Sequence, residues 1–258
     1  SYEISESINI RIVTTKDLDA LHILRHSSAH ILAQAVLNLY PNAQFGVGPS
    51  IENGFYYDFL FETPIKENEL ENIEKEMKSI AKSAQSFIRS EITKKDAVKI
   101  FRNQKLKLEL IESAESDEGV GEEIVSTYAN DEFIDLCMGP HVPSTSVLKH
   151  FKLTKVSGAY WRGDESNVQL QRIYGTSWFS KEDLDQYLIQ QEEAEKRDHR
   201  KLGNELDLFT SSEELGSGNF LWKPKGAVLR DVIETYSKKA HLQNLSLIHI
   251  SEPTRRLS

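Results

Sequence analysis

Two short motifs, far apart in the sequence, carry its most reactive side chains. The first is His26-Ser-Ser-Ala-His30, and the second is Cys137-Met-Gly-Pro-His141, with Asp135 just before it. Together they offer three imidazoles, one thiol and one carboxylate. Those groups are sufficient for either a hydrolytic site or a metal site.

The first motif lies in a stretch with helical periodicity. Apolar residues recur every three or four positions over residues 17–40, and Pro41 ends the pattern. His26 and His30 therefore share one face of a predicted helix. The pair alone is weak evidence for a site, because His22 continues the same row and most helical histidines are core or surface residues.

The second motif follows a strand-like run over residues 132–136. Gly139-Pro140 predicts a turn that lets Cys137 and His141 converge on one point. The thiol is the only one in the chain, and its place beside an aspartate and near a histidine favours a functional role. The alternative is a cysteine that serves as a small buried apolar residue.

Composition excludes several classes of protein. At 258 residues the chain suggests one full domain with flanking pieces. A single cysteine rules out a disulfide framework, and the N-terminus lacks a signal-peptide pattern, so a cytoplasmic location is expected. No apolar run approaches the length of a membrane span.

Charge argues against generic nucleic-acid binding, since 31 basic and 40 acidic residues give a net charge of -9. Basic residues nevertheless gather over residues 94–107 and again over 149–162. These stretches are either solvated faces of amphipathic elements or a phosphate-binding surface.

The remaining patterns predict an α+β fold with helices packed on an antiparallel sheet. Thr14 or Thr15 is the expected N-cap of the first helix, and Thr93 that of a later one. The expected strands cover residues 7–13, 86–92, 151–156, 158–161 and 168–174, and the expected helices cover 66–83, 94–102 and 180–202.

Two further segments bear on a site. Residues 44–54 form a glycine-rich loop before an aromatic strand over 55–61, and such glycines either let a backbone approach a ligand or simply make a hairpin turn. Residues 105–111 alternate between charged and apolar side chains. This alternation predicts a strand on which Lys107 faces solvent.

Five strings, in this order, closely resemble the editing module of bacterial-type threonyl-tRNA synthetases: HSSAHILAQAV, GPSIENGFYYDF, LKLELIE, FIDLCMGPHVPST and AYWRGDESNVQLQRIYGTSW. Two later strings, RDHRKLGNELDLF and FLWKPKGAVLRDVIETY, resemble the linker and first motif of a class II aminoacylation domain. The domains that this resemblance implies are the end of a small β-grasp-like module over 1–13, an editing domain over 14–179, a linker helix over 180–202, the start of the aminoacylation domain over 203–243, and an unrelated tail over 244–258.

The implied reaction is hydrolysis of the ester that joins serine to tRNA(Thr). Serine lacks one methyl group of threonine, and such a difference gives only about 1–3 kcal/mol of discrimination, so a second site must remove the mischarged product. The resemblance implies that the full-length parent attaches threonine to tRNA(Thr). It also places ATP, Mg²⁺ and a synthetic-site zinc in a catalytic domain expected downstream, so aminoacylation is not expected from this chain.

The resemblance also assigns site residues. Roles in water activation and in stabilising the departing ribose oxygen fall to the histidines and Lys107, while Asp135 holds the seryl ammonium or hydroxyl. Cys137 is left as a nucleophile, a polar pocket residue or a metal ligand. The full set comprises catalytic His26, His30, Lys107, Asp135, Cys137 and His141, with Gly48 and Tyr57 as pocket wall.

The same residues allow two interpretations, a zinc site and a metal-free site. The four nitrogen and sulfur groups have a spacing that suits tetrahedral zinc, as in alanyl-type editing modules. Threonyl-type modules are understood to work without zinc, and a lysine beside a dication is electrostatically unfavourable, so no metal is expected.

The resemblance implies, as partner, the serine-charged acceptor end of tRNA(Thr), a monomeric fragment and a homodimeric parent. Two other classes stay open, a zinc-dependent aminoacyl-tRNA hydrolase and a non-catalytic tRNA-binding fragment. Residues 160–164 and 172–174 have two interpretations. Their aromatic and basic side chains would stack on the single-stranded CCA end of the tRNA, or they form an ordinary packed strand pair.

Overall fold

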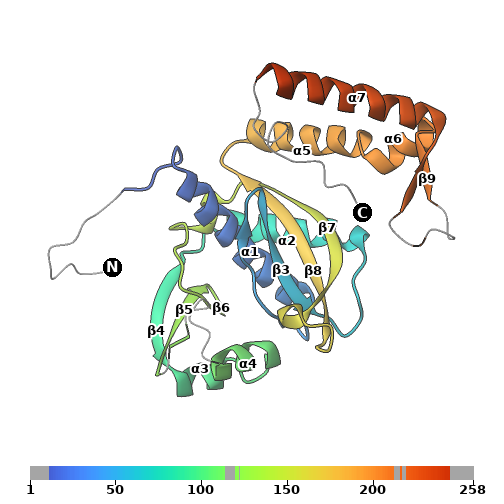
Figure 1. Ribbon diagram of the computed structural model, residues 1–258. Helices are drawn as coiled ribbons and strands as arrows, with labels where there is room; N and C mark the ends of the chain where they lie inside the picture. Colours follow the sequence, from blue (N-terminus) through green and yellow to red (C-terminus); the bar gives the residue numbers. More distant parts are fainter. Residues whose placement is uncertain (1–11, 114–119, 122, 212–215, 217–218, 245–258) are drawn as a thin grey trace. The chain divides into compact units, whose positions relative to one another are not determined.

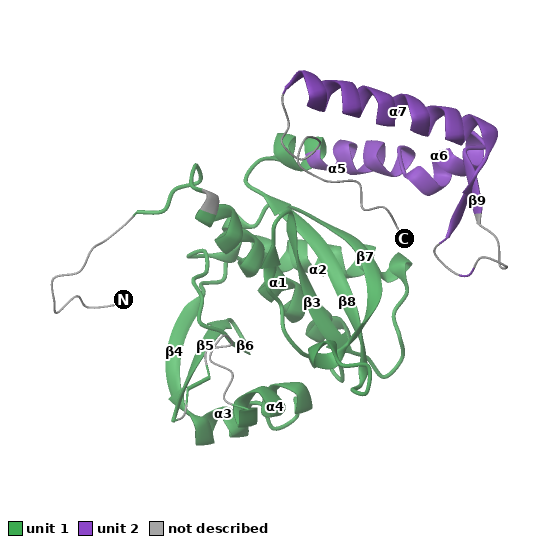
Figure 2. Ribbon diagram, in the orientation of Figure 1, with its two compact units in different colours: residues 1–186 green, residues 187–258 purple. Residues whose placement is uncertain are grey.

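The computed structural model describes residues 12–113, 120, 121, 123–211, 216 and 219–244. It divides into two compact units, Ser1–Gln186 and Tyr187–Ser258 (Figure 2). The predicted strand over 7–13 lies largely outside the described residues, and Ile12 and Val13 have no regular structure. The tail after Asn244 also lies outside them.

The first unit is built around a five-stranded sheet in which every neighbouring pair is antiparallel. Its strand order is β1-β3-β8-β7, with β2 paired to β3. The two strands expected over 151–156 and 158–161 are one continuous strand, β7, with a bulge between Leu153 and Lys155. The strands are β1 (Gln44–Phe45), β2 (Ser50–Ile51), β3 (Gly54–Leu60), β7 (His150–Tyr160) and β8 (Gln169–Trp178).

Two helices, α1 (Leu18–Leu39) and α2 (Leu70–Lys82), pack on one face of this sheet (Figure 1). Residues 24–36 of α1 are buried almost all round, which is typical of a central core helix. The N-cap of α1 is Asp17 rather than Thr14 or Thr15. The Asp17 carboxylate accepts hydrogen bonds from the amide and hydroxyl of Thr14, so the threonine acts on the cap residue and not on the helix.

A smaller antiparallel sheet, β4-β5-β6, lies with two short helices in the same unit. Thr93 caps α3 as predicted, with its hydroxyl accepting from the Asp96 amide at 3.2 Å. The elements are β4 (Ile88–Thr93), β5 (Ile124–Asn130), β6 (Phe133–Leu136), α3 (Lys94–Ile100) and α4 (Lys105–Ser113).

The strand predicted over 105–111 was wrong, because this segment is the helix α4. On a helix, residues four apart share a face, so Leu106 lies with Leu110 and Lys107 lies with Ile111. All four are buried. The period-two alternation was therefore coincidental, and Lys107 faces the core instead of solvent.

The second unit contains part of α5 (Lys181–Lys196), then α6 (His199–Glu205) and a hairpin of β9 (Phe209–Ser211) and β10 (Phe220–Trp222), followed by α7 (Pro224–Gln243). One helix was expected over 180–202, but Asp198 starts a new one by accepting from the Arg200 amide.

Helices and antiparallel sheets together confirm the α+β class. None of the helices in the described part of the chain combines the length and apolar character needed to cross a membrane.

Candidate active site

A pocket of about 200 Å³ opens beside α1, where the loop before β2 and the end of β6 meet the helix. Its volume suits a group of amino-acid size rather than a large ligand. The residues around it include His22, His26, His30, Gly48, Asp135 and Cys137.

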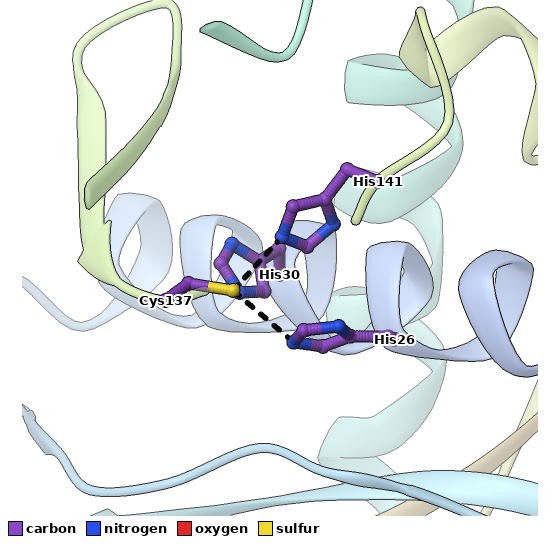
Figure 3. Close-up of side chains that lie close together, drawn as sticks. All are labelled: His26, His30, Cys137 and His141. Atoms are coloured by element: carbon purple, nitrogen blue, oxygen red, sulfur yellow. Dashed lines mark hydrogen bonds between the residues drawn. The ribbon is translucent and has the colours of Figure 1, made fainter. Parts of the chain in front are cut away.

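Four of the predicted side chains lie close together here, and three of them, His26, His30 and Cys137, line the pocket. His26 and His30 extend from α1, while Cys137 and His141 come from the chain after β6 (Figure 3). The Cys137 Sγ lies 3.4 Å from His26 Nε2 and 3.2 Å from His141 Nε2. The predicted convergence of Cys137 and His141 is therefore confirmed, and the structure brings the histidines of the first motif to the same place.

The turn between Cys137 and His141 depends on Gly139. Its φ of +77° lies in the left-handed region, and a Cβ there would come within 2.3 Å of the Tyr128 hydroxyl. The Gly139 amide donates to the Cys137 Sγ at 3.1 Å. This backbone geometry directs both side chains of the second motif to the pocket.

Burial keeps the three imidazoles neutral near pH 7. It lowers the pKa of His26 to about 4, despite the opposing effect of Asp135. Burial, and then the neighbouring imidazoles, also lower the pKa of His30 and of His141. Neutral imidazoles have a lone pair available to accept a proton or to bind a metal.

Lys107, Asp135 and Tyr57 form a buried polar group, of which Asp135 lines the pocket while Lys107 and Tyr57 lie behind it. The Lys107 Nζ lies 2.5 Å from Asp135 Oδ1, and the Tyr57 hydroxyl donates to Asp135 Oδ2 at 2.5 Å. Lys107 also donates to the Tyr57 hydroxyl at 3.2 Å, and its ammonium lies 4.9 Å from the centre of the Phe45 ring. Asp135 joins this group to the imidazoles, because its Oδ2 is 3.7 Å from His30 Nε2.

Gly48 and Tyr57 meet at the wall of the pocket. A Cβ on Gly48 would lie 2.1 Å from Tyr57 Cδ2, so only glycine fits against that ring. Tyr57 itself is 1% exposed and supports the wall from behind. The structure thus brings all eight predicted site residues together, some on the pocket surface and some beneath it.

The donor set fits zinc in kind. Three imidazole nitrogens and one thiol sulfur lie within 4.8 Å of one another, and His and Cys are the usual ligands of structural zinc. His30 Nδ1 is buried without a hydrogen-bond partner in the described part of the chain. The metal-free site that the resemblance implies stays a prediction.

Of the residues suggested for base stacking, Trp161 and Arg172 are packed, whereas Tyr160 is 42% exposed. Trp161 is 4% exposed, and its Nε1 donates to Glu109 at 2.8 Å. Arg172 makes a two-pronged ion pair with the buried carboxylate of Asp58. These contacts favour ordinary packing for Trp161 and Arg172, and stacking by the exposed Tyr160 stays a prediction.

Sequence reasoning assigned no role in the site to three residues. Ser27 contacts His141 and lay unremarked inside the first motif. Phe87 stacks on the His141 ring with centroids 4.7 Å apart, and nothing in its local sequence indicates this. His22 was visible in the helical row, and it lines the pocket and bonds to Ser50.

Comparison with known proteins agrees with this geometry. Residues 125–174 match the family described as threonyl and alanyl tRNA synthetase second additional domain. The match includes Asp135, Cys137 and His141.

Relatives resemble almost the whole chain. This chain is 47% identical over 242 residues to a threonine–tRNA ligase of Geobacter sp. (strain M21), and the aligned region covers 93% of this chain and 37% of the relative. It is 49% identical over 252 residues to that of Geobacillus sp. (strain WCH70), covering 97% and 38%. The ligase of Burkholderia multivorans is 52% identical over 239 residues, covering 92% and 36%.

The chain thus spans a little over a third of the length of the ligases it matches. The resemblance drawn from its sequence is confirmed. The segment carrying Asp135, Cys137 and His141 matches the threonyl and alanyl tRNA synthetase second additional domain family, within a chain similar to threonine–tRNA ligases over more than nine-tenths of its length.

Proposed function

We propose that this chain hydrolyses the ester of mischarged seryl-tRNA(Thr). The observation that carries the proposal is the pocket itself, in which neutral imidazoles and a buried lysine–aspartate pair meet around a space of about 200 Å³. Kinship with threonine–tRNA ligases supplies the substrate class. The parent protein would attach threonine to tRNA(Thr) with ATP in the cytoplasm.

Asp135 recognises the amino acid. Its carboxylate lines the pocket, and Lys107 and Tyr57 hold it in place from behind. A fixed carboxylate at the pocket surface attracts the seryl ammonium and orients the ester. Lys107 contributes positive charge that favours the developing negative charge of the transition state.

The imidazoles transfer the proton of the attacking water. A neutral histidine at the pocket accepts a proton from the attacking water and returns it to the ribose oxygen as the ester breaks. His26 and His30 both line the pocket, and His141 Nε2 lies 3.2 Å from the Cys137 Sγ. Cys137 contributes a polar group between two imidazoles.

Gly48 sets the size limit. The Tyr57 ring packs against the Gly48 backbone and Asp135 fixes the Tyr57 hydroxyl, so this part of the wall is rigid. A rigid wall is what a pocket needs to reject the extra methyl of threonine.

Deacylation tests the proposal directly. Seryl- and threonyl-tRNA(Thr) are incubated with the protein, with its His30→Ala, His141→Ala double variant, and with His150→Ala as a control histidine in β7. We expect selective serine release by the wild type and by the control, and none by the double variant. Binding of tRNA without release would reduce the chain to a non-catalytic tRNA-binding module.

A zinc-dependent form of the same hydrolysis is the second candidate, favoured by the four donor groups within 4.8 Å. When bound, zinc would polarise the ester and acidify water. The deacylation assay is therefore repeated after dialysis against EDTA. Activity that survives supports the metal-free reading, and activity that is lost and then restored by added zinc supports the other.

A further inference from the structure

We propose that Ser27 is a positioning residue that holds His141 in the tautomer with hydrogen on Nδ1, so that the Nε2 lone pair faces Cys137. Ser27 lies on α1 between the two histidines of the first motif and is 0% exposed. Its Oγ is 2.8 Å from the Ile23 carbonyl, 3.0 Å from the Val142 amide and 3.0 Å from His141 Nδ1.

The hydrogen count at this hydroxyl fixes the tautomer. A serine hydroxyl has one hydrogen to donate and two lone pairs to accept with. The Ile23 carbonyl can only accept, so it takes the hydrogen, and the Val142 amide can only donate, so it uses one lone pair. The remaining lone pair faces His141 Nδ1, which must therefore carry a hydrogen.

The other ring nitrogen, Nε2, carries no hydrogen if the ring has a single N–H. Among the described residues no carboxylate bonds to either ring nitrogen, so the ring has no anion to stabilise a second N–H and carries a single one. With that hydrogen on Nδ1, Nε2 presents a lone pair to the Cys137 Sγ at 3.2 Å. Nε2 can then accept the thiol hydrogen.

Aromatic neighbours fix the plane of the ring but not its hydrogen. Phe87 stacks parallel to His141 at 7°, and the Tyr128 ring lies edge-on with centroids 4.5 Å apart. Neither contact distinguishes the two tautomers. Among the residues that the structure describes, Ser27 is the sole hydrogen-bond partner of Nδ1.

The neighbouring serine offers a matched control. Ser28 is also 0% exposed and donates to the carbonyl four residues earlier, that of Leu24, at 2.9 Å. Within the described ranges its hydroxyl bonds to no histidine. Replacing either serine by alanine removes one helix back-bond, but only Ser27→Ala removes the acceptor for His141.

Long-range ¹H–¹⁵N spectra of the metal-free protein test the tautomer, with the His141 signals assigned by their loss in His141→Gln. We expect hydrogen on Nδ1 in the wild type and in Ser28→Ala, and a shift toward hydrogen on Nε2 in Ser27→Ala. Hydrogen on Nε2 in the wild type would overturn the inference, and this spectrum needs no variant of Ser27 to fold.

The effect on rate rests on the proposed hydrolysis. Partners that orient an imidazole change activity by roughly 10- to 100-fold when removed, so Ser27→Ala should slow serine release by that factor while Ser28→Ala does not. An unchanged rate in Ser27→Ala, despite a shifted tautomer, would contradict this role. If the wild type releases no serine, the proposed function fails while the spectrum still decides the tautomer.

Discussion

Lys107 and Asp135 form an ion pair with side chains only 1% and 2% exposed, their Nζ and Oδ1 atoms 2.5 Å apart. Such pairs add little net stability, because removing both charges from water costs about as much as their attraction returns. The pair is therefore better explained by its role at the pocket, where it holds the Asp135 carboxylate at the surface and the Lys107 ammonium just beneath.

Removing the Lys107 ammonium alone should strongly destabilise the protein. Lys107→Met leaves the Asp135 carboxylate buried with only the Tyr57 hydroxyl and distant His30 beside it. We expect the free energy of unfolding to fall by about 3–5 kcal/mol, the range for breaking one side of a buried pair. Urea denaturation measures this value, and serine release should be lost in parallel.

Lys105→Met is the matched control, since Lys105 begins the same helix and its side chain is exposed. A surface change of this kind should alter the free energy of unfolding by no more than about 0.5 kcal/mol. Equal effects of the two substitutions would show that the buried pair has no special role.

Sequence patterns predicted the parts of this fold that depend on local order. The period of α1 and the Thr93 cap were readable, because both follow from side chains within one or two turns. The segment that contains Lys107 was not. Its alternation fits a strand or a short helix equally, and only packing against the rest of the unit decides between them.

The site shows the same division. Convergence of Cys137 and His141 was predicted from a turn between neighbours in sequence. The contact of Tyr57 with Asp135 joins residues 78 positions apart, and no local pattern encodes such a pairing. Ser27 was missed because its role depends on a ring that approaches from a distant loop.

Gly48→Ala should disable the pocket wall. The new Cβ would lie 2.1 Å from Tyr57 Cδ2, so the ring must move and pull its hydroxyl from Asp135. Overpacking of this kind costs about 1–3 kcal/mol, and serine release should fall with it. Thermal unfolding and deacylation are measured on the same sample.

Gly158→Ala in β7 is the comparison, because a Cβ there meets only the end of the Gln169 side chain, at 3.1 Å. That side chain can move. If Gly48→Ala behaves like Gly158→Ala in both measurements, the wall does not depend on the absence of a side chain at position 48.

Acid should destabilise the protein through its buried histidines. Burial lowers the pKa of His26 from 6.5 to about 4, so between these values the folded protein binds fewer protons than the unfolded chain. The stability that the buried neutral His26 contributes is therefore fully present above pH 6.5 and is lost as the pH falls toward 4. Each such group contributes at most about 1.4 kcal/mol per pH unit.

Chemical denaturation at several pH values in this window, with EDTA present, measures the slope of stability against pH. His26→Gln should reduce the slope, and His150→Gln, outside the cluster, should leave it unchanged. A slope that is the same in the wild type and in His26→Gln would exclude His26 as a buried neutral group.

Recognition of the seryl ammonium by Asp135 gives a prediction about substrate chemistry. A tRNA(Thr) charged with 3-hydroxypropionate keeps the hydroxyl and ester of the seryl substrate but lacks the ammonium. A hydrogen bond to a charged group is worth about 1.5–3 kcal/mol, so the wild type should hydrolyse this ester at least about tenfold more slowly than the seryl ester. In Asp135→Asn the carboxylate is gone, and the two esters should be hydrolysed at similar, low rates. The ratio of the two rates in each protein forms a double-mutant cycle, in which a coupling close to zero would show that Asp135 does not hold the ammonium.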